Sequence, residues 1–256
     1  MKKIIDAHIH LDQYKKEVIK KMLDDKSIEG VIAVSMDQSS CIQNLQLAKR
    51  YSFVHAAFGF HPEQKLPKEK ELADLILWME KHQQHMTAIG EVGLPHYARK
   101  EDPTAFPLEP YIELLEQFIL LAKKLSKPIC LHSIYEEAPI VLGLLEKHNY
   151  MYAHFHWFKG DEKTIDHLIA NGCFVSITPD LLYEQEIQAL VAKFPLEQLM
   201  VETDGPWPFE GPFSQKETMP YMMHSTVNEM AKIKKNSVDT VYDSLLSNTK
   251  KFFSIL

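Results

Sequence analysis

The side chains that could do chemistry in this 256-residue chain stand at the ends of short apolar segments. Five segments end in histidine, glutamate or aspartate: Ile4–His10, Ala88–Glu91, Pro128–His132, Tyr152–His156 and Leu199–Asp204. In a barrel of parallel strands, residues that are scattered through the sequence meet at the rim where the strands end. Imidazoles and carboxylates gathered at such a rim would hold divalent metal ions and activate water. The pattern therefore predicts a metal-dependent hydrolase.

One predicted metal site draws on the first, second and last of these segments. Residues two apart on a strand point to the same face, so His8 and His10 can both face the barrel axis, with Asp6 one further step along that face. Glu91 follows an apolar strand and has glycines on both sides, where a buried carboxylate is costly unless it is paired or binds metal. We expect Glu91 to bridge two cations. Asp204 would complete the first site and accept a proton from the activated water.

The second predicted site uses histidines from the middle of the chain. His132 would be one ligand and either His154 or His156 another, because a spacing of two residues points both of the latter inward. His61 follows the third predicted strand and precedes a proline, so it can touch substrate or the residues around the ligands. Glu202 could orient a ligand or a water molecule without touching metal.

The elements that must position these residues alternate along the chain. Eight strands are predicted at Lys3–Ala7, Gly30–Ser35, Val54–Gly59, Thr87–Val92, Pro128–His132, Tyr150–His156, Cys173–Ile177 and Leu199–Thr203. Most are apolar on both faces, as expected of parallel strands that helices cover. Helical periodicity marks Tyr14–Asp25, Ser40–Tyr51, Lys68–His82, Glu109–Leu125, Glu136–His148, Asp161–Ala170, Glu184–Phe194, Tyr221–Lys235 and Ser237–Phe253. No linker interrupts the alternation, so we expect one domain over residues 1–256. A Pro/Phe-rich loop, 205–220, would form either a substrate wall or a packed lid at the metal rim.

Composition limits the class of protein and its partners. Hydrophobic residues make up 45% of the chain and charged residues 25%, which is typical of a soluble globular protein. The formal net charge of -7 gives no general attraction to nucleic acid or anionic lipid, so a nucleic-acid substrate would have to be held by the site and its metals. Three cysteines without CxxC spacing indicate a reducing compartment. No apolar run approaches the roughly 20 residues that cross a bilayer. We expect a cytoplasmic protein without a membrane anchor or an evident obligate protein partner.

Seven motifs, in order, resemble those of the TatD family of metal-dependent hydrolases in the amidohydrolase superfamily. They are Asp6–Leu11 (D-x-H-x-H-L), Gly59–Pro62 (G-x-H-P), Ile89–Leu94 (I-G-E-x-G-L), Pro128–Ser133 (a strand ending in H-S), His156–Gly160 (H-x-F-x-G), Glu202–Pro206 (E-T-D-x-P) and Asn248 with Phe252 (N-x-x-x-F). The resemblance covers nearly the whole chain and favours His156 over His154 as the ligand.

The resemblance implies a TIM (β/α)8 barrel with its active site at the C-terminal ends of the strands and with one or two metals. By carry-over, one metal would be held by His8, His10, Glu91 and Asp204, and the other by Glu91, His132 and His156. We expect two divalent ions per chain, and Zn, Mn, Mg, Fe and Co all stay open. Members of the family act mainly as deoxyribonucleases or phosphodiesterases, which makes DNA or another phosphodiester the expected substrate.

Two positions depart from the family pattern and keep other functions open. Pro95 stands where the family has Asp, and Ile134 where it commonly has an Arg that would suit bidentate phosphate contact. His96, Arg99 or Lys159 could compensate. The leading hypothesis is a TatD-type deoxyribonuclease or phosphodiesterase with Asp204 as general base. The alternative is an amidase or deacylase that acts on a small substrate. A non-catalytic barrel scaffold is less favoured, since it predicts a damaged metal shell and every ligand position is present.

Overall fold

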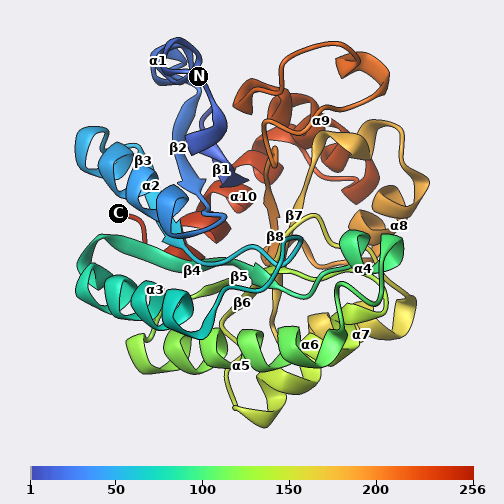
Figure 1. Cartoon of the computed structure of the whole chain (residues 1–256). Helices are drawn as coiled ribbons and strands as arrows, with labels where there is room; N and C mark the ends of the chain where they lie inside the picture. Colours follow the sequence, from blue (N-terminus) through green and yellow to red (C-terminus); the bar gives the residue numbers. More distant parts are fainter. Residues whose placement is uncertain (1) are drawn as a thin grey trace.

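An eight-stranded parallel sheet forms the centre of the molecule (Figure 1). The structure is a computed structural model that describes residues 2–256. Each strand pairs in parallel with the next in sequence: β1 (Ile4–Ile9), β2 (Ile28–Ala33), β3 (Val54–Phe58), β4 (Met86–Gly93), β5 (Ile129–His132), β6 (Ala153–Phe155), β7 (Phe174–Ile177) and β8 (Leu199–Val201). The eight predicted strands are all present, with ends shifted by a few residues.

Helices surround the strands (Figure 1). They are α1 (Lys16–Asp24), α2 (Gln38–Arg50), α3 (Glu69–Lys81), α4 (Tyr97–Glu101), α5 (Leu108–Leu125), α6 (Glu137–Lys147), α7 (Glu162–Ala170), α8 (Gln185–Lys193), α9 (Met223–Lys234) and α10 (Val238–Phe253). All the predicted helices are present, and the short helix α4 was not predicted. Strands and helices alternate as a TIM-like barrel requires, so the predicted fold class is confirmed. In the part of the chain that the structure describes, no helix is long and apolar enough to span a membrane.

The last strand meets the first through bonds just beyond its end. The Asp204 N–H donates to the His8 carbonyl oxygen at 2.9 Å, and the His10 N–H donates to the Gly205 carbonyl oxygen at 2.8 Å. The buried Asp6 carboxylate accepts from the Thr203 N–H at 3.0 Å and from the Thr203 hydroxyl at 2.5 Å. Residues almost 200 positions apart in sequence are thereby brought into contact at one rim.

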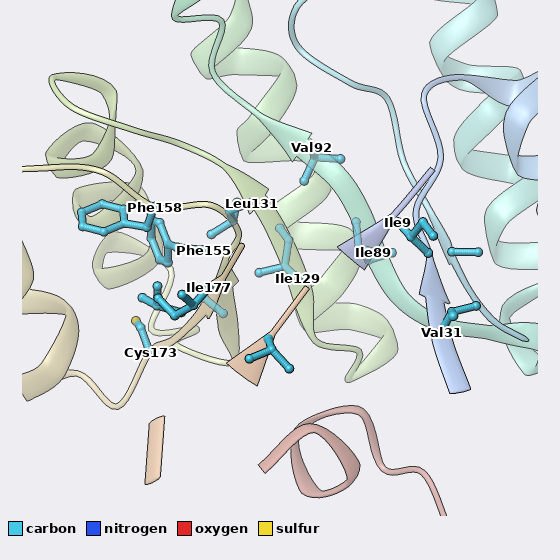
Figure 2. Packing of buried hydrophobic residues seen from close by; sticks show 14 of the residues in the cluster. Ile9, Val31, Ile89, Val92, Ile129, Leu131, Phe155, Phe158, Cys173 and Ile177 are labelled. Atoms are coloured by element: carbon cyan, nitrogen blue, oxygen red, sulfur yellow. The ribbon is translucent and has the colours of Figure 1, made fainter. Parts of the chain in front are cut away.

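Buried apolar residues form two main layers around the strands. In the larger cluster, Ile89, Val92 and Leu131 are among the side chains that pack between the strands and the helices (Figure 2). In a second cluster, small strand residues such as Ala88 pack with Phe252 of α10. The packing positions the strand ends because neighbouring strands cannot slide without opening voids in a close-packed interior.

An irregularity in β4 turns Glu91 toward the centre. Ile89 and Val92 are three residues apart and would face opposite sides of a regular strand, yet both pack in the larger cluster. The pairing of β4 with β5 shifts register between them, as at a bulge. At Gly93, a Cβ atom would lie 1.9 Å from the carbonyl oxygen of His132, so only glycine permits this close approach. Glu91 and His132 therefore lie side by side.

Candidate metal centre

The structure brings together all six residues that the sequence predicted as metal ligands. They come from five strands and the turns that follow them: His8 and His10 at β1, Glu91 in β4, His132 at the end of β5, His156 after β6 and Asp204 after β8. Every one of these side chains is buried. A buried cluster of imidazoles and carboxylates is the donor set that divalent transition metals prefer.

Four of the atoms have the spacing of a single metal site. The Nε2 atoms of His8 and His10 lie 3.0 and 3.3 Å from Glu91 Oε2. The same two nitrogens lie 3.4 and 3.3 Å from Asp204 Oδ1. A tetrahedral ion with bonds of about 2.1 Å would hold its ligands about 3.4 Å apart. Asp204 Oδ1 is also buried without a hydrogen-bond partner. These four residues fit one divalent cation.

The other oxygen of Glu91 faces a second set of histidines. Glu91 Oε1 lies 2.8 Å from His156 Nε2, 2.9 Å from His132 Nδ1 and 3.2 Å from His61 Nε2. His132 Nδ1 and His156 Nε2 are 3.3 Å apart. Each carboxylate oxygen of Glu91 thus faces its own group of ring nitrogens, which is the arrangement that a carboxylate between two cations requires. His61, expected near substrate or around the ligands, lies directly against this carboxylate.

The charges of the centre are arranged to hold positive charge between the carboxylates. Burial lowers the pKa of His8 to about 4, assisted by the neighbouring His156. Burial would also lower the pKa of His10, but Asp204 and Glu91 outweigh it and raise that pKa to about 10. Despite burial, the surrounding imidazoles hold the pKa of Glu91 well below its usual range. The carboxylates are therefore ionised at neutral pH and available to cations.

Glu63, which sequence reasoning missed, connects the centre to helix α4. Its carboxylate accepts from the backbone N–H groups of His96, Tyr97 and Ala98 at 2.7, 2.9 and 2.7 Å. Its Oε1 also lies 3.0 Å from His132 Nε2. Burial opposes ionisation, but His132 and these N–H groups lower the pKa of Glu63 to about 2. Glu63 thus holds the ring of His132 with Nδ1 toward Glu91. The available signal was its position two residues after His61, at the end of β3.

Two further predicted residues lie beneath the centre. His154 Nε2 is 2.5 Å from Ser176 Oγ, whereas His156 Nε2 is the nitrogen that reaches Glu91, so the distances favour His156 as the ligand. Glu202 accepts from the Trp157 N–H at 2.6 Å, and its Oε1 lies 3.8 Å from His156 Nδ1. Trp157 has a φ of 38°, which a non-glycine residue seldom adopts. Glu202 thereby fixes the turn that carries His156.

A cavity of about 410 Å³ opens over the centre. Its floor is polar, and its walls are apolar or aromatic: the lining residues are His61, Glu63, Glu91, Tyr97, His132, Ile134, His156, Trp157, Asp204, Trp207 and Pro208. Trp207 and Pro208 belong to the loop after β8, so part of that loop is a wall. Its Phe209 and Phe213 pack with Met222 as a lid would. The loop thus contributes both to the wall of the cavity and to a small buried apolar cluster.

Within residues 2–256, no lysine or arginine lines this cavity. Arg99 Nη1 instead lies 3.2 Å from Glu137 Oε1, and His96 Nδ1 lies 2.8 Å from Glu137 Oε2. Lys159 is not among the lining residues either. Ile134 does line the cavity, so the position at which the family commonly has arginine contributes an apolar surface.

Comparisons with known proteins agree with this geometry. The family model described as "TatD related DNase" matches residues 5–254. A Haemophilus influenzae protein named "uncharacterized metal-dependent hydrolase" is 40% identical over 253 residues, which are 98% of this chain and 100% of the relative. The human deoxyribonuclease TATDN3 is 28% identical, over 98% of this chain and 94% of the relative. In fold, the chain resembles the crystal structure of YjjV, a TatD homologue from Escherichia coli, with a TM-score of 0.88 at 23% identity, over 99% of this chain and 98% of that one.

Proposed function

Because the chain belongs to the TatD family of metal-dependent hydrolases, we propose that it hydrolyses phosphodiesters, those of DNA included, with two divalent metal ions. The observation that carries this proposal is the placement of Glu91, whose two oxygens face different groups of histidines. Two ions that share one bridging carboxylate would be close enough to stabilise both the attacking and the leaving oxygens of a phosphodiester.

The residues would divide the work as follows. His8, His10, Glu91 and Asp204 would hold one ion, and the second would be held by Glu91 with His132 and His156, beside His61. When bound, such ions lower the pKa of water and polarise the scissile group. Asp204 would accept the proton of the attacking water. Burial opposes its ionisation, but His10 and the other imidazoles hold its pKa below the usual range, so the carboxylate is ready to accept.

A second candidate, an amidase or deacylase, rests on the walls of the cavity. Ile134 and the aromatic residues line it, and in the described part of the chain no cationic side chain does. A neutral ester or amide needs no counter-charge beyond the centre, so this wall suits such a substrate as well. The same water and the same Asp204 would then act on a carbonyl carbon.

Turnover by metal-stripped protein, refilled with Mn²⁺, Zn²⁺ or Mg²⁺, separates the two candidates. Bis(p-nitrophenyl) phosphate tests phosphodiester cleavage, and p-nitrophenyl acetate with an acyl p-nitroanilide tests carbonyl attack. We expect phosphodiester turnover that metal restores and that Asp204→Asn abolishes. Asp239→Asn is the matched control, because that side chain is 76% exposed on α10. Turnover of the carbonyl substrates alone would contradict the proposed function and favour the second candidate. End-labelled single-stranded DNA would follow a positive result.

A further inference from the structure

We infer that the cavity takes a small substrate in which one anionic group is attached directly to one planar aromatic ring. The inference rests on the proposed function, since the anionic group would be held at the metal centre. It follows from three features of the walls: an aromatic surface that is already fixed, two aromatic side chains that are exposed beside the centre, and the distribution of charge.

Trp157 provides the fixed surface. Its indole Nε1–H donates to Asp180 Oδ2 at 2.6 Å, and the buried Asp180 also accepts from the Thr178 hydroxyl. The ring of Trp157 packs on Phe209 with centroids 5.8 Å apart. A side chain held in this way loses little conformational freedom when a ligand packs against it. The hydrogen bond and the contact with Phe209 leave the part of Trp157 that lines the cavity available to a ligand.

Tyr97 and Trp207 provide the exposed surfaces. They belong to α4 and to the loop after β8, and they are 55% and 46% exposed although both line the cavity. Such large aromatic rings gain most when another ring covers them. Both belong to the lining that includes the ligands: the Tyr97 ring is 6.4 Å from the His132 ring, and Trp207 lines the same cavity as Asp204, which lies three residues before it in the chain. Within a cavity of about 410 Å³, a ring that packs against these side chains must therefore be bonded close to the group held at the centre.

Charge restricts the rest of the substrate. The cavity carries Glu63, Glu91 and Asp204 but, over residues 2–256, no lysine or arginine. Arg99, the nearest candidate from the sequence, is paired with Glu137. The metal ions can balance one anionic group at the floor, and further phosphates along a chain would meet no cation. The site thus suits a ring-bearing monoanion, such as an aryl ester of phosphate, better than an extended strand bound along its backbone.

The test compares two probes that share an anionic head and differ only in the ring. Calorimetry would measure the binding of phenylphosphonate and methylphosphonate to the metal-loaded protein. We expect the phenyl compound to bind at least about tenfold more tightly, because stacking on an aromatic side chain strengthens binding by this much in nucleic-acid complexes. Trp207→Ala should reduce this ratio to about threefold or less, and Tyr97→Ala should act in the same direction. Tyr221→Ala is the matched control, because Tyr221 is 45% exposed and does not line the cavity, and it should keep the ratio.

The outcomes distinguish this inference from the proposed function. Equal binding of the two probes would overturn the aromatic subsite and leave the metal centre intact. A preference for phenyl that survives both Trp207→Ala and Tyr97→Ala would overturn the assignment of the ring to these two exposed side chains. Binding of neither probe to protein that carries its metals would overturn the anion site on which the proposed function depends, and this inference with it.

Discussion

Removal of the Glu63 carboxylate should weaken one metal site and leave the other nearly intact. Glu63 accepts from three backbone N–H groups of α4 and lies 3.0 Å from His132 Nε2, but it does not touch the His8–His10 side of the centre. Loss of a group that orients a metal-ligating histidine typically costs 10- to 100-fold in metal affinity, about 1.4–2.8 kcal/mol. We expect a loss of this size for the His132 site in Glu63→Ala. The other site should change by less than about threefold, since it shares only Glu91.

The same residue predicts how the stability of the metal-free protein depends on pH. The pKa of Glu63 falls from 4.5 to about 2 on folding, a difference worth up to about 3 kcal/mol. Because the folded pKa is the lower one, this contribution is present above about pH 4.5 and is lost as the pH falls toward 2. The raised pKa of His132, about 10, reflects the same ion pair, so it adds no separate contribution to the free energy of unfolding. Glu63→Gln should therefore flatten the loss of stability between about pH 5 and pH 2, the window that runs from the unfolded pKa down to the folded one.

Two assays test this reasoning. Titration with Zn²⁺ against a competing chelator gives both metal affinities for wild type, Glu63→Ala and Glu63→Gln. Urea unfolding of metal-free protein at several pH values gives the free energy of unfolding. Equal weakening of both metal sites would show that Glu63 acts through the fold as a whole. Unchanged affinities, with unchanged pH dependence of unfolding, would refute the role of the carboxylate altogether.

Four further predictions follow from the geometry. Because His10 and His132 have pKa values near 10 without metal, metal binding at pH 8 should release about two protons and strengthen about 100-fold per pH unit, as calorimetry in buffers of different ionisation enthalpy would measure. Glu91→Gln should lower the metal content at both sites and Asp204→Asn at one, as elemental analysis would show; equal losses would contradict the assignment. Gly93→Ala should destabilise the protein by about 3 kcal/mol or prevent folding, because its Cβ would meet the carbonyl oxygen of His132. If DNA is cleaved, a plot of log kcat/KM against log salt concentration should be nearly flat, because each phosphate contact with a cationic side chain would add a slope of about −0.7 on single strands. A steep slope would reveal a basic groove elsewhere.

The fold and the gathering of the six imidazole and carboxylate residues were predictable because both depend on short stretches of sequence. Each strand is a brief apolar run, and in a parallel barrel the ligand at its end reaches the common rim whatever the intervening helices contain. Strict alternation was less reliable. It placed Asp6 on the face of His8 and His10, but the register of β1 shifts after Asp6, whose carboxylate binds Thr203. A bulge adds one residue without changing composition, so the pattern of apolar residues does not reveal it.

The contacts around the centre were harder to predict because they join segments that are distant in sequence. Glu63 contacts the start of α4, which lies 33–35 residues further along the chain, and His132, which lies 69 residues further along. Helix α4 has only five residues, too few to show a helical period. Its first N–H groups are satisfied by the carboxylate of Glu63 rather than by a capping residue of its own. No local pattern marks such a partner.

The centre and its walls therefore limit function in different ways. Ligands at strand ends determine the kind of reaction, because they fix where a cation and an activated water can lie. We expect the substrate to depend on the loops, from which Tyr97 on α4, Trp207 after β8 and Ile134 after β5 line the cavity. In this chain the cavity walls are apolar or aromatic and, among the described residues, include no lysine or arginine. Binding energy beyond the reacting group must then come from apolar contact rather than from charge, which favours a short ring-bearing substrate over a long polyanion.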